Sequence, residues 1–516
     1  MTWPPPLLLS YPHQAWSLDA TAAGVDPEAL AALPWASALQ EQEALEAGAI
    51  ANPDEQRRVG HFWLRDATLA PTLELAGEID AAVEQVRDLA RGVRDGVHRT
   101  DAGEAFTDVV HLGIGGSALG PRLIVHALGT DAHGRRRGLP VHFVDNVDPD
   151  GLTCLLGLLG ERLATTLVVV ASKSGGTAEP LRGLARLRQA FEDRGLRPAA
   201  RLVAITTPGS RLDRQARQEQ WLASLPVWDW VGGRFSVTST VGLLPCELAG
   251  VDTAGVLEGA AAMDHWTRRT DPLANPAAVL AGAWYLLGEG RGARDLVVLP
   301  YADRLDLLGR HLQQLVMESV GKRLDRQGQP VHHGLTVYGN KGSTDQHAFV
   351  QQLRDGRDDA LVTFVQVLSP SPADPELGDG VSAGDQLQGF LLGTRRALRQ
   401  DGRPSLTLTA ATLDGRALGS LIALFERAVG LYASLVDVNA YDQPGVEAGK
   451  VAATRILALA EALRTRLRAA PATVPALAEA LEADPVEVLF LLQRAAVRGA
   501  VAADGPDPLL ARWRLP

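Results

Sequence analysis

Residues 108–120 read DVVHLGIGGSALG, a β-branched run that ends in a cluster of glycines. The run predicts a buried strand, and the glycines let the backbone come close to a ligand. The helix expected after them would offer unpaired N–H groups to an anion. Alone, the loop also fits a plain strand–helix turn, or a dinucleotide site in which Gly113, Gly115 and Ala118 match G-x-G-x-x-G/A. Asp145 stands further along the chain than the acidic residue of that fingerprint.

Similar strand-like runs recur along the chain and alternate with helical stretches. Strands that alternate with helices predict an α/β fold of parallel sheets flanked by helices. The runs fall into two groups, 141–145, 166–171 and 201–206 in the first, and 295–300, 335–338, 360–365 and 405–409 in the second.

A chain of 516 residues is too long for one hydrophobic core. We therefore expect one α/β domain over 105–250 and a second over 275–455. Residues 1–104 are expected to be a helical N-terminal region, and 470–516 a small helical C-terminal extension.

The composition is that of an ordinary soluble protein, with 46% hydrophobic and 22% charged residues. A net charge of -11 argues against a nucleic-acid partner. No apolar run reaches the length of a membrane span, and the N-terminus has no basic leader, so we expect a cytoplasmic protein without membrane contact. Cys154 and Cys246 have no metal-ligand spacing, and we expect two reduced, buried thiols.

A second polar loop, residues 172–177, follows the strand at 166–171 and reads SKSGGT. Its three hydroxyls, two glycines and one lysine suit a phosphate cradle, although the spacing is not that of a P-loop. Loops at the carboxyl ends of strands in one sheet can converge on one crevice. An ordinary polar turn remains the alternative.

Three further segments carry polar side chains that chemistry can use. Arg234 directly follows two glycines in 231–236, and Gln314 and Glu318 are four residues apart on a helix expected over 304–320. His347 ends the polar loop 339–347. Most helical glutamates are only solvated and most single histidines are structural. Neither Glu318 nor His347 is therefore assigned a role from its own position alone.

Lysine is rare here, because 46 of the 50 basic residues are arginine. A lysine kept in such a chain points to a place that needs a compact charge, which a planar guanidinium does not supply. The four positions are Lys173, Lys322, Lys341 and Lys450.

Six motifs, in order, resemble those of the glucose-6-phosphate isomerase family. They cover residues 113–121, 172–177, 232–236, 317–322, 339–347 and 439–450, the last reading NAYDQPGVEAGK. The chain departs from the usual pattern in the loop before His347, at Val320 in place of Asn, and in a cradle with one hydroxyl fewer.

This resemblance implies two sugar-isomerase (SIS-type) α/β domains and a homodimer with shared active sites. It implies reversible aldose–ketose isomerisation of glucose 6-phosphate and fructose 6-phosphate, in glycolysis and gluconeogenesis, through a cis-enediol. No cofactor and no metal would be needed. The alternatives are a non-catalytic sugar-phosphate sensor, an isomerase that also acts on mannose 6-phosphate, and a nicotinamide-dependent dehydrogenase.

The resemblance also assigns residues. Glu318 would be the proton-transfer base, His347 would open the sugar ring with help from Lys450, and Arg234 would lie beside the enediolate. The residues implied to bind substrate are Gly116, Ser117, Ser172, Lys173, Ser174, Thr177, Gly233, Gln314 and Gln443.

Overall fold

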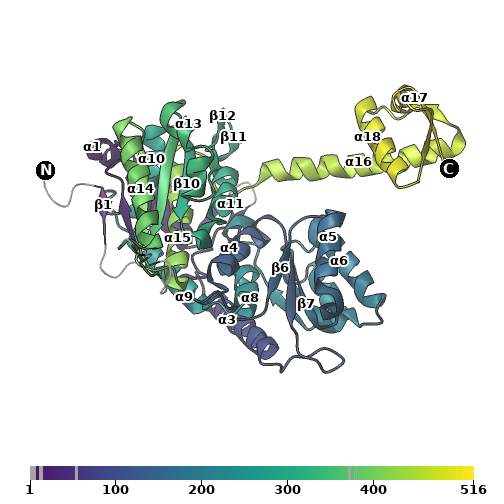
Figure 1. Ribbon diagram of the computed structural model, residues 1–516, viewed down its shortest axis with the longest axis horizontal. Helices are drawn as coiled ribbons and strands as arrows, with labels where there is room; N and C mark the ends of the chain where they lie inside the picture. The colour runs from purple at the N-terminus through teal and green to yellow at the C-terminus, as the bar shows by residue number, and fades with distance from the viewer. Residues whose placement is uncertain (1–6, 11–14, 53–55, 370–373, 377, 379) are drawn as a thin grey trace. The chain divides into compact units, whose positions relative to one another are not determined.

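The computed structural model describes residues 7–10, 15–52, 56–369, 374–376, 378 and 380–516 (Figure 1). The chain divides into two compact units, Met1–Asp442 and Gln443–Pro516. Each is described by itself.

The first sheet of the larger unit is fully parallel, in the order β6-β5-β7-β8-β9. This confirms the parallel sheet that the β-branched runs predicted; only the last strand, which has no such run, was missed. The strands are β5 (Asp108–Leu112), β6 (Val141–Val144), β7 (Thr166–Ala171), β8 (Leu202–Thr206) and β9 (Ala223–Pro226).

Helices cover both faces of this sheet because alternate strand residues point to opposite sides. Val169 and Val203 pack toward one hydrophobic cluster and Val168 and Val170 toward another. The first cluster includes residues of α3 (Leu73–Arg94) and α8 (Thr240–Leu248), and the second those of α5 (Pro149–Leu159), α6 (Ala178–Glu192) and α7 (Arg211–Gln218).

The second sheet is mixed, in the order β1-β2-β15-β14-β10-β13. Its last four strands are parallel, while β2 pairs antiparallel with β15. The N-terminal region, expected to be helical, thus also supplies the two strands at one end of this sheet. The strands are β1 (Leu8–Leu9), β2 (Trp16–Asp19), β10 (Asp295–Tyr301), β13 (Val337–Tyr338), β14 (Ala360–Val367) and β15 (Ser405–Ala410).

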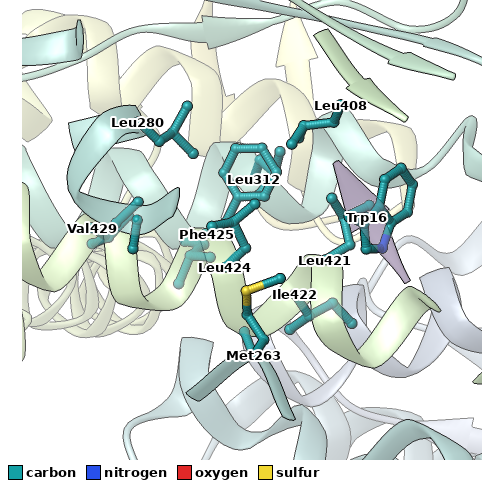
Figure 2. Close-up of a cluster of buried hydrophobic side chains, with 14 of the residues drawn as sticks. Trp16, Met263, Leu280, Leu312, Leu408, Leu421, Ile422, Leu424, Phe425 and Val429 are labelled. Carbon is teal, nitrogen blue, oxygen red and sulfur yellow. The ribbon is translucent and has the colours of Figure 1, made fainter. Parts of the chain in front are cut away.

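One long helix, α15 (Gly415–Leu435), forms the centre of the largest hydrophobic cluster. Figure 2 shows its residues Leu424 and Phe425 among side chains from the sheet and from other helices, such as Leu408 and Met263. By length and composition α15 is the one described helix that could cross a membrane, and 89% of its apolar window is buried inside the fold. It is the core helix of this unit.

The helix predicted over 304–320 is interrupted. It consists of α11 (Leu308–Leu312), a π-helical turn η7 (Gln313–Met317) and α12 (Glu318–Val320). Single π-helical turns inside helices often occur at functional sites. Of the predicted site residues, Gln314 lies within this turn and Glu318 directly follows it.

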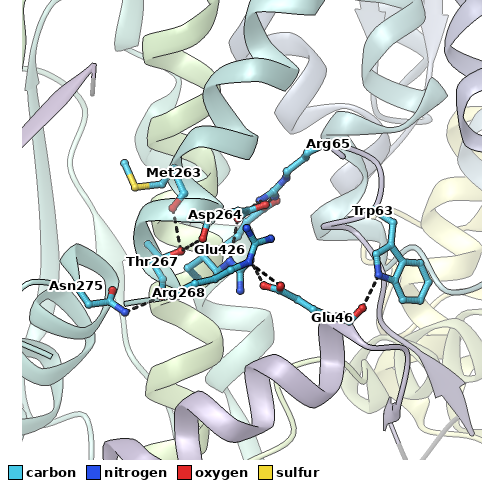
Figure 3. A network of polar contacts seen from close by, with 10 residues as sticks. Glu46, Trp63, Arg65, Met263, Asp264, Thr267, Arg268, Asn275 and Glu426 are labelled. Atoms are coloured by element: carbon cyan, nitrogen blue, oxygen red, sulfur yellow. Dashed lines mark hydrogen bonds and ion pairs between the residues drawn. The ribbon is translucent and has the colours of Figure 1, made fainter. Parts of the chain in front are cut away.

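A buried network of charged side chains links the N-terminal region to α15 (Figure 3). Asp264 on α9 (Thr253–Thr267) pairs with Arg65 at 2.8 Å and with Arg427 at 2.9 Å. Arg65 also contacts Glu426, and Arg427 contacts Glu46. Buried charges are tolerated only when paired in this way. Of the two cysteines, Cys246 is buried as expected, but Cys154 is exposed.

The smaller unit begins with α16 (Pro444–Ala469) and has its own core. The sequence predicted its helices but not its three-stranded antiparallel sheet, ordered β16-β18-β17. The remaining elements are β16 (Ala472–Thr473), α17 (Val474–Ala480), α18 (Pro485–Val497), β17 (Ala502–Asp504) and β18 (Arg512–Arg514).

Candidate active site

The predicted phosphate cradle lies in the loop between β7 and α6, and its hydroxyls face its own backbone. Ser172 Oγ donates to Thr177 Oγ1 at 2.9 Å, and Ser174 Oγ accepts from the N–H of Gly176 at 3.2 Å. Gly175 has a positive φ of 66°, which favours glycine. A tight turn rich in hydroxyl and N–H groups suits an anion.

Lys173 links this cradle loop to the segment 231–236 that contains Arg234, the arginine loop. Its Nζ donates to the carbonyls of Asp229 at 3.2 Å and Val231 at 2.9 Å, just before Gly232. We expected Lys173 to add charge to the cradle. Its ammonium also joins the cradle loop to the arginine loop.

The glycine loop, residues 113–120 after β5, packs against the same arginine loop. A Cβ added to Gly116 would lie 1.8 Å from the carbonyl oxygen of Gly233, so only glycine allows this approach. A Cβ added to Gly115 would lie 2.8 Å from Nε2 of Gln314. The glycines therefore bring the first loop against both the arginine loop and the π-helical turn.

Arg234 is buried, with 5% of its surface exposed, and uses its whole guanidinium group. Nε donates to Ser319 Oγ at 2.7 Å, and Nη2 donates to the carbonyls of Ala440 and, at 3.0 Å, Asp442. Nη1 lies 3.6 Å from Oε2 of Glu318. The arginine is thus fixed in place with one nitrogen directed at the predicted base.

Glu318 begins α12, directly after the π-helical turn, and its side chain is 26% exposed. Gln314 Nε2 donates to both carboxylate oxygens, at 3.3 and 3.4 Å. The carboxylate is therefore held between an amide and a guanidinium group while part of it stays open to solvent. A fixed, accessible carboxylate is what a general base requires.

Lys322, one of the four lysines, lies four residues after Glu318 and contacts the end of the same helix. Its buried Nζ donates to the carbonyls of Glu318 at 2.9 Å and Asp442 at 3.1 Å, and pairs with the Asp442 carboxylate at 2.5 Å. Burial lowers the pKa of Lys322, and the Asp442 carboxylate opposes that shift. Asp442 lies within the motif at 439–450, but no role was predicted for it, because its contacts join distant segments.

His61 was also missed by sequence reasoning, although it supports the arginine loop. Its buried ring stacks on Phe235 with centroids 4.5 Å apart. Burial, followed by the charges of Arg65, Arg427 and Arg234, holds the pKa of His61 well below its usual value. A neutral imidazole therefore packs behind Arg234 without adding a competing charge.

His347 is not part of this cluster in the described unit. It ends the short helix η8 (Thr344–His347), is exposed, and within the described residues has no hydrogen bond to Glu318 or Arg234. Its loop is organised by the buried Asp345, whose carboxylate accepts from the N–H groups of Asn340 at 2.7 Å and Lys341 at 3.1 Å. The loop is ordered while its histidine faces outward.

Three other predicted site residues lie in the glycine loop or at α16. Ser117 lies in the glycine loop, where its carbonyl is 2.7 Å from Nε2 of His111. Gln443 is the N-cap residue of α16 and belongs to the smaller unit. Lys450 lies on α16, and its side chain is outside the described residues. Across the described ranges, no group of three or more His, Cys, Asp or Glu residues could hold a metal ion.

Comparison with known proteins decides the family. The sequence profile described as phosphoglucose isomerase matches residues 26–372 and 392–470. The chain belongs to the phosphoglucose isomerase family. The resemblance that the six motifs indicated is therefore confirmed.

Relatives of this chain match it over most of their own length. A glucose-6-phosphate isomerase of Synechococcus sp. (strain JA-3-3Ab) is 53% identical over 89% of this chain and 87% of its own. One from Synechococcus sp. (strain CC9605) is 55% identical over 82% of this chain and 78% of its own. Among solved structures, the glucose-6-phosphate isomerase of Chlamydia trachomatis is 30% identical with a TM-score of 0.79, covering 88% of this chain and 90% of its own.

Proposed function

We propose that this chain interconverts glucose 6-phosphate and fructose 6-phosphate, as an aldose–ketose isomerase of glycolysis and gluconeogenesis. The observation that carries the proposal is that Arg234, on a loop that packs against the glycine loop, lies 3.6 Å from Glu318 of α12. The family supplies the reaction. A silent sensor would not need a base held in this way.

Moving the carbonyl group requires a proton to pass between C2 and C1. We assign this step to the carboxylate of Glu318, which takes the proton from one carbon and returns it to the other through a cis-enediol. Negative charge grows on oxygen in that intermediate, and the fixed guanidinium group of Arg234 stabilises it. Gln314 orients the carboxylate and contacts a sugar hydroxyl.

The phosphate of the substrate binds at Ser117, Ser172, Ser174 and Thr177, with Lys173 beside them. Binding energy from this remote group holds the reacting carbons in position. Gly116 and Gly233 let the backbone approach the sugar. Lys173 and Gly116 both contact the arginine loop. The phosphate-binding residues and the charge-stabilising Arg234 are therefore held in place by the same contacts.

Ring opening is assigned to His347 and Lys450, and Gln443 is assigned to a sugar hydroxyl. The outward position of His347 supports a homodimer with shared active sites, in which a residue exposed in one chain can reach the site of another. The reduced Cys154 and Cys246 support a cytoplasmic location.

The test is a Glu318→Gln variant, which keeps the shape of the side chain and removes the base. We expect turnover of fructose 6-phosphate to fall by roughly 10²–10⁴-fold, the usual contribution of a positioned acid–base group, while binding persists. Glu258→Gln, an exposed position on α9, is the matched control. A coupled assay measures turnover and calorimetry measures binding. Near-normal turnover in Glu318→Gln would remove Glu318 from the mechanism.

A further inference from the structure

The segment after residue 470 lies beyond the match to the family profile and packs with the end of α16 into one small core. Helices α17 and α18 are joined by a short turn and followed by the β17–β18 hairpin (yellow in Figure 1). Leu477, Val488, Leu492 and Trp513 are almost fully buried in its core. The isomerase chemistry assigns this helix–turn–helix and hairpin no task.

The outer face of α18 carries an apolar stripe. Val488 and Leu492 point into the core, and the residues opposite them on the helix wheel are exposed. Val486 is 52% exposed, Phe490 62% and Val497 83%. Three large apolar side chains aligned on one helix face indicate a surface that another molecule covers.

Charged residues flank this stripe on one side only. Glu487, near the start of α18, and Arg494 and Arg498, at its end, are all exposed. At 100° per residue they fall within one narrow row beside Phe490. The row is acidic at one end and basic at the other.

We propose that this face of α18 binds the same face of a second copy of the chain, with the two helices antiparallel. A two-fold axis midway between Leu491 and Leu492 pairs Val486 with Val497, and Phe490 with Gln493. Glu487 then falls between the levels of Arg494 and Arg498 of the second copy, about 3 Å along the axis from each. The apolar stripe and the charge row are both self-complementary, as a closed two-fold interface requires.

Other occupants fit the face less well. In a parallel pair the two-fold axis places the charge rows on opposite sides, where no pairing forms. In DNA-binding helix–turn–helix proteins the start of the second helix reads the bases. Here that start carries Asp484 and Glu487, which repel phosphate, and apolar side chains occupy the centre.

One helix face of this length is smaller than a standard stable interface, so the test must capture a weak contact. Two full-length chains, one with Glu487→Cys and one with Arg494→Cys, are co-expressed with different tags, both with Cys154→Ser to remove the exposed thiol. They are treated with a short bismaleimide cross-linker. Glu479→Cys replaces Glu487→Cys in the matched control, because Glu479 is exposed on α17.

We expect the mixed product to form several-fold more strongly than in the control, and to disappear when Phe490→Asp is added to both chains. Isomerase activity should stay unchanged in every variant, so the result is independent of the proposed reaction. A mixed product no stronger than the control overturns the proposal, as does equal cross-linking of Glu487→Cys chains to one another. Retardation of a random DNA duplex that Phe490→Asp abolishes would also overturn it.

Discussion

Arg234 directs one guanidinium nitrogen at the Glu318 carboxylate from 3.6 Å, while its other nitrogens bind Ser319 and the carbonyls of Ala440 and Asp442. The distance is longer than a tight ion pair, and Glu318 keeps part of its surface exposed. The arginine therefore lies beside the carboxylate without forming a tight ion pair with it. The position of Arg234 is set by its hydrogen bonds to Ser319, Ala440 and Asp442, and not by its contact with Glu318.

Replacing Arg234 by lysine tests this division of roles. A lysine keeps one charge but cannot make the forked contacts to Ser319 and the two carbonyls, so its ammonium will not be held beside the reacting oxygen. We expect kcat to fall by roughly 10²–10³-fold, as when a preorganised donor is removed. Steady-state kinetics measure this. Arg323→Lys, at the exposed position after Lys322, is the control and should leave kcat unchanged. Equal effects of the two variants on kcat would contradict the role of Arg234.

The approach of Gly116 to Gly233 predicts a strict requirement for glycine. An alanine Cβ at 116 would lie 1.8 Å from a backbone oxygen, so the two loops must separate and the site must widen. We expect Gly116→Ala to lose most activity and about 1–3 kcal/mol of unfolding free energy from overpacking. Gly157→Ala on α5, where a Cβ meets nothing within 4 Å, is the control. Full activity of Gly116→Ala would show that the loops need not touch.

Local sequence was enough to predict the parallel strands and the polar loops that follow them. Thr166–Ala171 is a continuous apolar run, and its loop motif lies where the strand ends. By contrast β9 (Ala223–Pro226) reads ASLP, which has no β-branched residue, and β2 forms by pairing with Thr407–Ala410 far along the chain. These strands depend on tertiary pairing, which local propensity does not report.

In the candidate site, too, local sequence predicted some contacts and missed those that depend on tertiary packing. Gln314 and Glu318 were predicted to share a helix face, and they touch, although a π-helical turn replaces the regular helix between them. The contact of Lys322 with Asp442 joins two motifs that lie far apart in the sequence, and His61, which packs behind Phe235, lies in no motif. The motifs predict which residues meet the substrate, whereas the contacts that hold those residues depend on packing between distant segments.

The buried charge network of Figure 3 predicts a large stability effect at a distance from the site. Asp264 is 1% exposed and accepts from both Arg65 and Arg427. Asp264→Asn leaves those buried guanidinium groups short of a counter-charge, which costs about 3–5 kcal/mol when a buried pair is broken. Urea unfolding measures the loss. Asp80→Asn, an exposed position on α3, should change stability little, and a similarly small loss at Asp264 would contradict the ion-pair account.

Buried histidines predict how stability responds to acid. Burial lowers the pKa of His311 to about 4, and burial also lowers that of His111 to about 4. Between about pH 6.5 and 4 both are neutral in the folded chain, whereas the unfolded chain takes up protons there. Their contribution to stability is therefore complete above pH 6.5 and is lost as pH falls toward 4, by at most about 1.4 kcal/mol per pH unit for each.

His311→Leu isolates one of these groups, because leucine keeps an apolar side chain in the buried position on α11 and removes the titrating ring. We expect the variant to show a shallower fall in unfolding free energy between pH 6.5 and 5 than the parent chain. That window lies above the titration of ordinary carboxylates, so the imidazoles dominate it. Urea unfolding at closely spaced pH values gives the slope, and His133→Leu, in an exposed loop, is the control. If His311→Leu and the parent chain have the same slope, His311 takes up its proton without unfolding and is not the neutral core residue that its burial indicates.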